Sequence, residues 1–81
     1  MEGLLWYKND KTLTLEAKIA GAARRYQEKN GRPPNTCFIN PANNERDEGE
    51  FAVEVDGVTI QVTTRPNVLL HHYWIGELEH A

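Results

Sequence analysis

Hydrophobic and polar residues alternate most regularly in the segment Phe51–Val62, FAVEVDGVTIQV. This alternation predicts two strands joined at Asp56-Gly57, a pair that tolerates the positive φ angles of a type I′ turn. With a two-residue turn, the facing pairs are Val55 with Val58, Val53 with Ile60, and Phe51 with Val62. All six side chains then share one face, and a one-residue slip of the register would break that agreement. An isolated hairpin cannot bury this face, so another element must cover it.

The segment Leu15–Asn30 has the period of an amphipathic helix. Thr14 is placed to cap its start and Gly31 to end it, and Pro33-Pro34 prevents its continuation. The apolar stripe consists of Leu15, Ile19, Ala22, Ala23 and Tyr26. Small alanines allow close approach to a sheet, so this helix is predicted to cover the hairpin. Gly21 falls off the stripe, and the sequence offers no reason for it.

Further strands are predicted at residues 4–8, 36–40 and 72–78, and a polar, acidic loop at 42–50. The resulting architecture is a single α+β domain spanning 1–81. It has two layers, one helix (about 15–30) packed on an antiparallel sheet of three to five strands with a hairpin at 51–62. One helix covers one sheet face, so the opposite face is predicted to be solvated or used for binding.

The composition is that of one small globular domain: 81 residues, 40% hydrophobic and 26% charged. No apolar run is long enough to span a membrane, and the N-terminus does not resemble a signal peptide. A single cysteine, Cys37, predicts a reducing, cytoplasmic location. The tail Leu78-Glu79-His80 resembles a cloning junction, so whether it is native is left open.

The net charge of −3 is unevenly distributed. Residues 1–32 contain seven basic and four acidic groups, whereas residues 33–81 contain two basic and eight acidic groups. A mildly basic first third followed by an acidic remainder is typical of ordinary solvated charge. It would also suit a surface that steers a charged partner.

Candidate metal ligands are Cys37, His71, His72 and His80, but none has the close paired spacing of a zinc site. His71 and His72 are adjacent, so on a strand they point to opposite faces. Asn43, Glu45, Asp47 and Glu54 repeat part of a calcium-loop spacing, yet Glu48 stands where the loop needs glycine. No metal and no cofactor is therefore predicted.

Candidate catalytic groups are equally sparse. Cys37 lies in an apolar strand, where a small buried thiol is commoner than a nucleophile. The chain has no serine, and its glycines are scattered singly, so a serine triad and a glycine-rich phosphate loop are excluded. The carboxylates Glu45, Asp47, Glu48 and Glu50 belong to a polar loop that is predicted to be exposed. The sequence therefore does not predict an enzyme.

Two binding hypotheses remain. The first is a protein interface, since Trp6, Tyr7, Tyr73 and Trp74 lie on predicted strands and each neighbouring pair must send one aromatic to each face. The second is a nucleic-acid-binding module that uses the basic helix, with Lys18, Arg24, Arg25, Lys29 and Arg32 as contacts. Net acidity disfavours the second hypothesis. The leading expectation is a small accessory domain that binds another protein or a second copy of itself.

Overall fold

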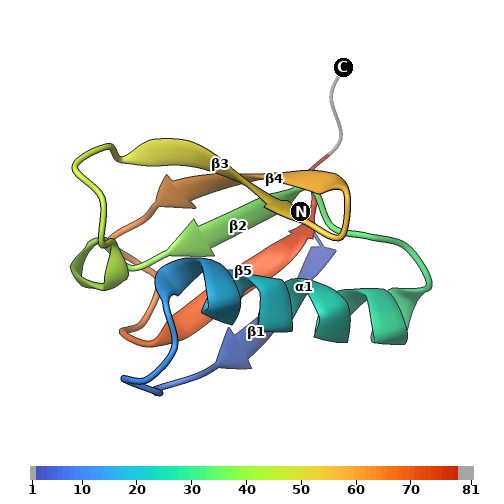
Figure 1. The fold of residues 1–81 in the computed structure, drawn as a ribbon, viewed down its shortest axis with the longest axis horizontal. Helices are drawn as coiled ribbons and strands as arrows, with labels where there is room; N and C mark the ends of the chain where they lie inside the picture. The colour runs from blue at the N-terminus through green and yellow to red at the C-terminus, as the bar shows by residue number, and fades with distance from the viewer. Residues whose placement is uncertain (1, 79–81) are drawn as a thin grey trace.

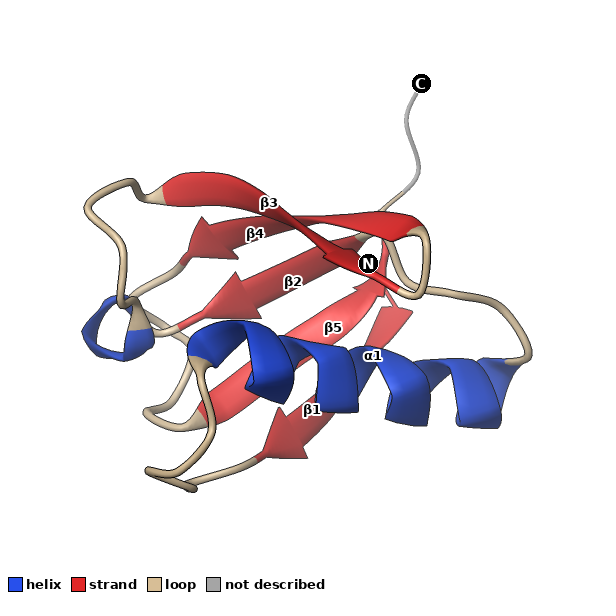
Figure 2. Ribbon diagram, viewed as in Figure 1, coloured by secondary structure: helices blue, strands red, loops and turns tan. Residues whose placement is uncertain are grey.

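A computed structural model describes residues 2–78 of the chain. Its element order is β1 (Glu2–Tyr7), α1 (Leu15–Asn30), β2 (Thr36–Ile39), the 3₁₀ turn η1 (Pro41–Asn43), β3 (Glu50–Val55), β4 (Val58–Thr64) and β5 (His72–Glu77). The strands form one sheet, and α1 crosses a single face of it (Figure 1; Figure 2). The predicted two-layer α+β class is confirmed, with the helix at the predicted residues.

The sheet is mixed, which corrects the expectation of a wholly antiparallel sheet. Its order is β1-β5-β2-β4-β3, and β2 runs parallel to β4 while every other pairing is antiparallel. The physical reason is the connection 40–49. This connection leaves β2, passes over the neighbouring position in the sheet and places β3 one strand further out. The next strand, β4, pairs antiparallel with β3 and fills the position between β3 and β2, where it runs parallel to β2 (Figure 1). A pattern of apolar alternation contains no information about such a skip.

The hairpin has the predicted register. Phe51 faces Val62, Val53 faces Ile60 and Val55 faces Val58. Asp56 and Gly57 have φ angles of 52° and 83°, the positive values that a type I′ turn requires. Five of the six side chains are buried and Val58 is partly buried, so the local pattern set both the turn and the face.

The helix begins and ends as predicted. The Thr14 hydroxyl accepts from the Ala17 amide at 3.1 Å, which satisfies one of the unpaired N–H groups at the helix start. Gly31 closes the other end with a φ of 73°, and its N–H donates to the Gln27 carbonyl. The buried helix residues are the predicted stripe: Leu15, Ile19, Ala22, Ala23 and Tyr26.

The core lies between α1 and the sheet, but the helix is not centred on the hairpin. It contacts β5 most extensively, then β1 and β3. The prediction that the helix covers the hairpin is therefore correct in part, since α1 lies mainly over β5 and β1 and contacts the hairpin chiefly through β3. Ile60 and Val62 of β4 are nevertheless fully buried, within the same core cluster as the helix stripe.

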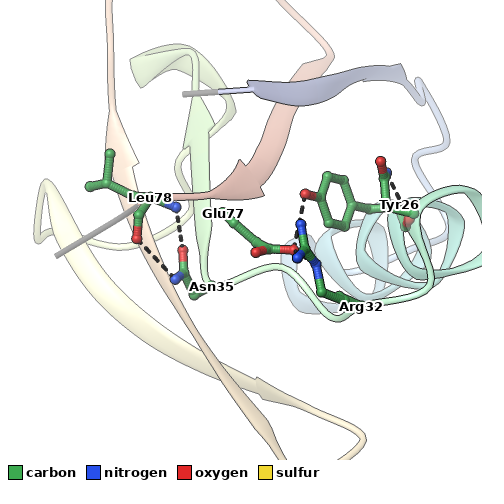
Figure 3. Close-up of polar contacts among 6 residues, drawn as sticks. Tyr26, Arg32, Asn35, Glu77 and Leu78 are labelled. Carbon is green, nitrogen blue, oxygen red and sulfur yellow. Dashed lines mark hydrogen bonds and ion pairs between the residues drawn. The ribbon is translucent and has the colours of Figure 1, made fainter.

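A polar cluster joins the C-terminal end of α1 to the end of β5 (Figure 3). The Glu77 carboxylate accepts from the Tyr26 hydroxyl at 3.3 Å and from Arg32 Nε at 3.1 Å. Beside it, the Asn35 side chain accepts from the Leu78 amide at 2.8 Å and donates to the Leu78 carbonyl at 3.1 Å. Asn35 thus holds the backbone of Leu78, which directly follows β5. Glu79 and His80 of the tail lie outside the described residues.

Within residues 2–78, no helix has both the length and the apolar character that a membrane crossing demands.

Candidate binding groove on the open sheet face

Strand register divides the four predicted interface aromatics between the two faces of the sheet. Trp6 is opposite Tyr73, and both lie on the side of the helix, where their ring centroids are 6.0 Å apart. Tyr73 is fully buried and Trp6 is partly buried against the core. Tyr7 and Trp74 therefore lie on the side away from the helix, which we call the open face. The structure brings these two to a surface and places Tyr73 in the core.

Three apolar side chains from neighbouring strands line up across the open face. Leu5 of β1 is opposite Trp74 of β5, and Trp74 is in turn opposite Phe38 of β2. The row continues to Thr63 of β4, where the face becomes polar. Directly opposite strand residues lie about 5 Å apart, so these side chains form one continuous apolar surface.

A groove of about 520 Å³ lies over this row. It is lined by Leu5, Phe38, Arg65, Asn67, Val68, Leu69 and Trp74. The strands supply its floor, and the connection 65–71 between β4 and β5 supplies its wall. Mainly apolar concavities with a few placed polar groups are the usual form of a binding site.

Hydrogen bonds hold the wall of the groove in place. Asn40 Nδ2 donates to the Val68 carbonyl at 2.7 Å, and Asn43 Oδ1 accepts from the His71 amide at 2.6 Å. Lys8 N donates to the His71 carbonyl at 3.0 Å, which ties the connection to β1 as well. His71 has a φ of 64°, a left-handed conformation that non-glycine residues adopt rarely. The groove is therefore built by fixed backbone rather than by a loose loop.

Arg65 supplies a cation at the groove. Its guanidinium lies over the Phe38 ring, 4.8 Å from the centroid. The other four arginines each form an ion pair with a carboxylate: Arg24 with Asp56, Arg25 with Glu28, Arg32 with Glu77 and Arg46 with Glu16. Across residues 2–78, Arg65 has no carboxylate partner, so its charge is available to a ligand.

Tyr7 extends the aromatic surface beyond the groove. Its ring lies 5.0 Å from the ring of His72 and 6.5 Å from that of His71. Tyr7 remains 58% exposed, and Leu5 remains 49% exposed. The exposed large apolar residues thus include Leu5 and Tyr7 of β1 and Leu69 and Leu70 of the connection 65–71, while the β3 and β4 part of the open face is polar.

The basic residues of the nucleic-acid hypothesis are spread around α1 and its end. Arg24 makes a two-pronged contact with Asp56 at the hairpin turn, at 3.2 and 3.3 Å. Arg25 and Arg32 are also paired with carboxylates. Lys18 is partly buried and Lys29 is exposed. Three of these five basic side chains are therefore already paired with a carboxylate. Nucleic-acid binding by the helix stays a prediction.

The acidic loop has a structural use at its first residues. Glu45 Oε1 accepts from the Leu15 amide at 2.9 Å, so a carboxylate sits at the N-terminus of α1, where its charge is favourable. Arg46 donates to Glu16 at 2.7 Å and lies over the Phe51 ring, 4.4 Å from its centroid. The loop thus binds the start of the helix.

Cys37 and Tyr73 carry titratable protons and have no exposed surface. Burial raises the pKa of the Cys37 thiol to about 12. Burial also raises the pKa of the Tyr73 hydroxyl to about 12, with smaller contributions from nearby Cys37 and Glu45. Neither group is charged at neutral pH, and neither opens onto the groove. In the part of the chain that the structure describes, no three His, Cys, Asp or Glu side chains are grouped to hold a metal ion.

Sequence reasoning identified Trp74 and Tyr7 as candidates but missed Leu5, Phe38, Arg65 and Leu69. A signal existed for Phe38, because a residue that alternates with a buried Cys37 must lie on the other face of its strand. Arg65 and Leu69 had no such signal, since they reach the groove only through the path of the 65–71 connection.

No protein-family model, curated protein sequence or solved structure matches this chain.

Proposed function

We propose that this domain binds an extended segment of a partner protein in the groove on its open face. The observation that supports this proposal is the apolar row Leu5–Trp74–Phe38 beneath a preformed wall. Tryptophan and arginine are the side chains that most often dominate protein interfaces, and this groove contains one of each.

The chemistry of the groove favours one kind of segment. Its floor would accept an aliphatic or aromatic anchor, and Arg65 would pair with a carboxylate next to that anchor. Because the Phe38 ring already supports the guanidinium, less side-chain freedom is lost when an acidic group binds. The preferred ligand is therefore a short apolar and acidic peptide.

A random-peptide display selection on the folded protein tests the proposal. We expect enrichment of peptides with a large apolar residue next to Asp or Glu. Synthetic versions should bind Trp74→Ala at least about tenfold more weakly, a loss of roughly 1.4 kcal/mol. Arg65→Glu should reduce binding selectively for the acidic peptides. Gln61→Ala, on the polar part of the same face, serves as the matched control and should bind normally.

Two results would contradict the proposal: no enriched peptides, or peptides that bind Trp74→Ala as well as the wild type. The nucleic-acid hypothesis is tested in parallel with a pyrimidine-rich single-stranded oligonucleotide at low salt. Binding that is weakened by Arg24→Ala plus Arg25→Ala, and by added salt, would favour the helix surface instead.

A further inference from the structure

The strand β1 forms one edge of the sheet and has unused backbone groups. It pairs on one side only, with β5. Lys8 N donates to the His71 carbonyl, so Trp6 and Leu4, at alternate positions, also direct their amides toward β5. The amides and carbonyls of Gly3, Leu5 and Tyr7 therefore point outward. None of them has a backbone partner within residues 2–78.

The two edges of the sheet differ in their protection. The outward positions of β3 are Glu50, Ala52 and Glu54, all exposed, and two of the three carry a negative charge. Charged side chains on an edge discourage pairing with another chain. The corresponding positions of β1, Gly3 through Tyr7, have no charged side chain. Of the two edges, β1 is the one open to a further strand.

We propose that β1 pairs antiparallel with β1 of a second copy of this chain, about a two-fold axis at Leu5. In that register Leu5 faces Leu5, Gly3 faces Tyr7 and Leu4 faces Trp6. Gly3, Leu5 and Tyr7 of one copy then all face outward-pointing residues of the other copy. The N–H and the C=O of each can therefore form hydrogen bonds across the interface. The Tyr7 ring would cover Gly3 of the other copy, a contact that stabilises glycine at strand edges.

Other registers use the edge less completely. Slipping by one residue would set Leu5 against Trp6, whose amide is already directed to β5. Moving the axis to Leu4 leaves Tyr7 without a facing position inside the segment 3–7, and moving it to Trp6 leaves Gly3 without one.

The side chains fit the same arrangement. On the open face, the exposed Leu5 would lie beside its own copy, and the exposed Tyr7 would lie beside Gly3 of the other copy. Leu4 and Trp6, which are only partly buried, would meet on the helix side. The interface is the same patch on both copies, so it closes as a dimer and leaves the acidic β3 edges outermost. Leu5 belongs both to this axis and to the groove, but the pairing depends on the backbone edge of β1, whereas peptide binding depends on Trp74 and Arg65, so Trp74→Ala separates the two proposals.

Sedimentation velocity over a range of concentrations tests the dimer. The wild type should move from the 9.3 kDa monomer toward twice that mass as concentration rises. Leu5→Lys and Leu5→Glu should each remain monomeric, because like charges then face each other on the axis. An equimolar mixture of the two variants should recover the dimer. Ala52→Lys, on the opposite edge, and Trp74→Ala, in the groove, should dimerise like the wild type.

Hydrogen exchange on the wild type provides a test that needs no variant. The amides of Gly3, Leu5 and Tyr7 should exchange more slowly as concentration rises, and those of Glu50, Ala52 and Glu54 should not. A wild type that stays at 9.3 kDa at the highest concentration would overturn the proposal. So would dimerisation of Leu5→Lys alone, a mixture that stays monomeric, or loss of the dimer in Ala52→Lys.

Discussion

Single residues of this domain take their roles from neighbours that are distant in the sequence. Gly21 has no explanation from the helical pattern, but the structure places the Trp6 ring directly beside it. A Cβ atom at this position would lie 3.0 Å from Trp6 Cη2 and 3.3 Å from Cζ2. The glycine therefore allows an aromatic of the edge strand to pack along the helix.

This contact predicts a coupling between positions 21 and 6. Gly21→Ala should gain about 1 kcal/mol of helix propensity, but in the wild type the crowded Trp6 ring offsets that gain. In a Trp6→Phe background, which lacks the two crowded atoms, the gain should appear in full. The coupling is measured from the free energies of unfolding in urea of the wild type, the two single variants and the double variant. Equal effects of Gly21→Ala in both backgrounds would show that the ring does not constrain position 21.

At the scale of elements, the N-terminus of α1 depends on the loop that precedes β3. Glu45 binds the Leu15 amide, and Arg46 pairs with Glu16 in the first turn. The sequence predicted this loop only as a polar connection, because its contacts span 30 positions in the chain. These contacts of the loop stabilise the start of the helix.

The Glu16–Arg46 pair predicts a specific pH dependence. Its hydrogen bond to Arg46, followed by one from backbone N–H, lowers the Glu16 pKa from its ordinary 4.5. The resulting stabilisation is present above pH 4.5 and is lost as the pH falls through the lowered pKa of the folded state. Because both side chains are partly exposed, we expect at most about 1 kcal/mol, reduced by salt.

Urea unfolding of the wild type and Glu16→Gln at several pH values measures this effect. The wild type should be more stable at neutral pH, and the difference should vanish in acid. Asp47→Asn, a neighbouring loop carboxylate, is the control and should follow the wild type. A difference between wild type and Glu16→Gln that does not change with pH would contradict the assignment to this ion pair.

At the scale of the whole molecule, the sheet has one covered face and one open face, and its central strand β2 carries the single cysteine of the chain, Cys37. Cys37 has no exposed surface and lies between β5 and β4. The same strand presents Phe38 to the groove. Core and candidate site are therefore opposite sides of one strand, which gives the groove a rigid floor.

Cys37 should consequently report on opening of the entire domain. Its thiol should react with a disulfide reagent only in molecules whose sheet has opened, because burial excludes the reagent and raises the pKa to about 12. The labelling rate should rise with urea in parallel with the unfolded fraction. Ala17→Cys in a Cys37→Ala background, exposed on the helix, should label at once. Rapid labelling of native Cys37 would reveal a local opening of β2.

The sequence by itself determined the elements whose causes are local. The 51–62 hairpin follows from alternation around an Asp-Gly turn, and the 15–30 helix follows from its apolar stripe and its end residues. These patterns act over a few positions, where backbone geometry and side-chain direction are tightly linked.

Only the tertiary structure decided the parallel pairing of β2 with β4, the position of α1 over β5 and β1, and the groove. Each depends on where a connection travels: 40–49 skips a strand position, and 65–71 folds beside the open face. Chain paths of this kind are set by the combined packing of distant segments. For that reason Phe38 and Arg65, far apart in the sequence, form one surface that neither local pattern contains.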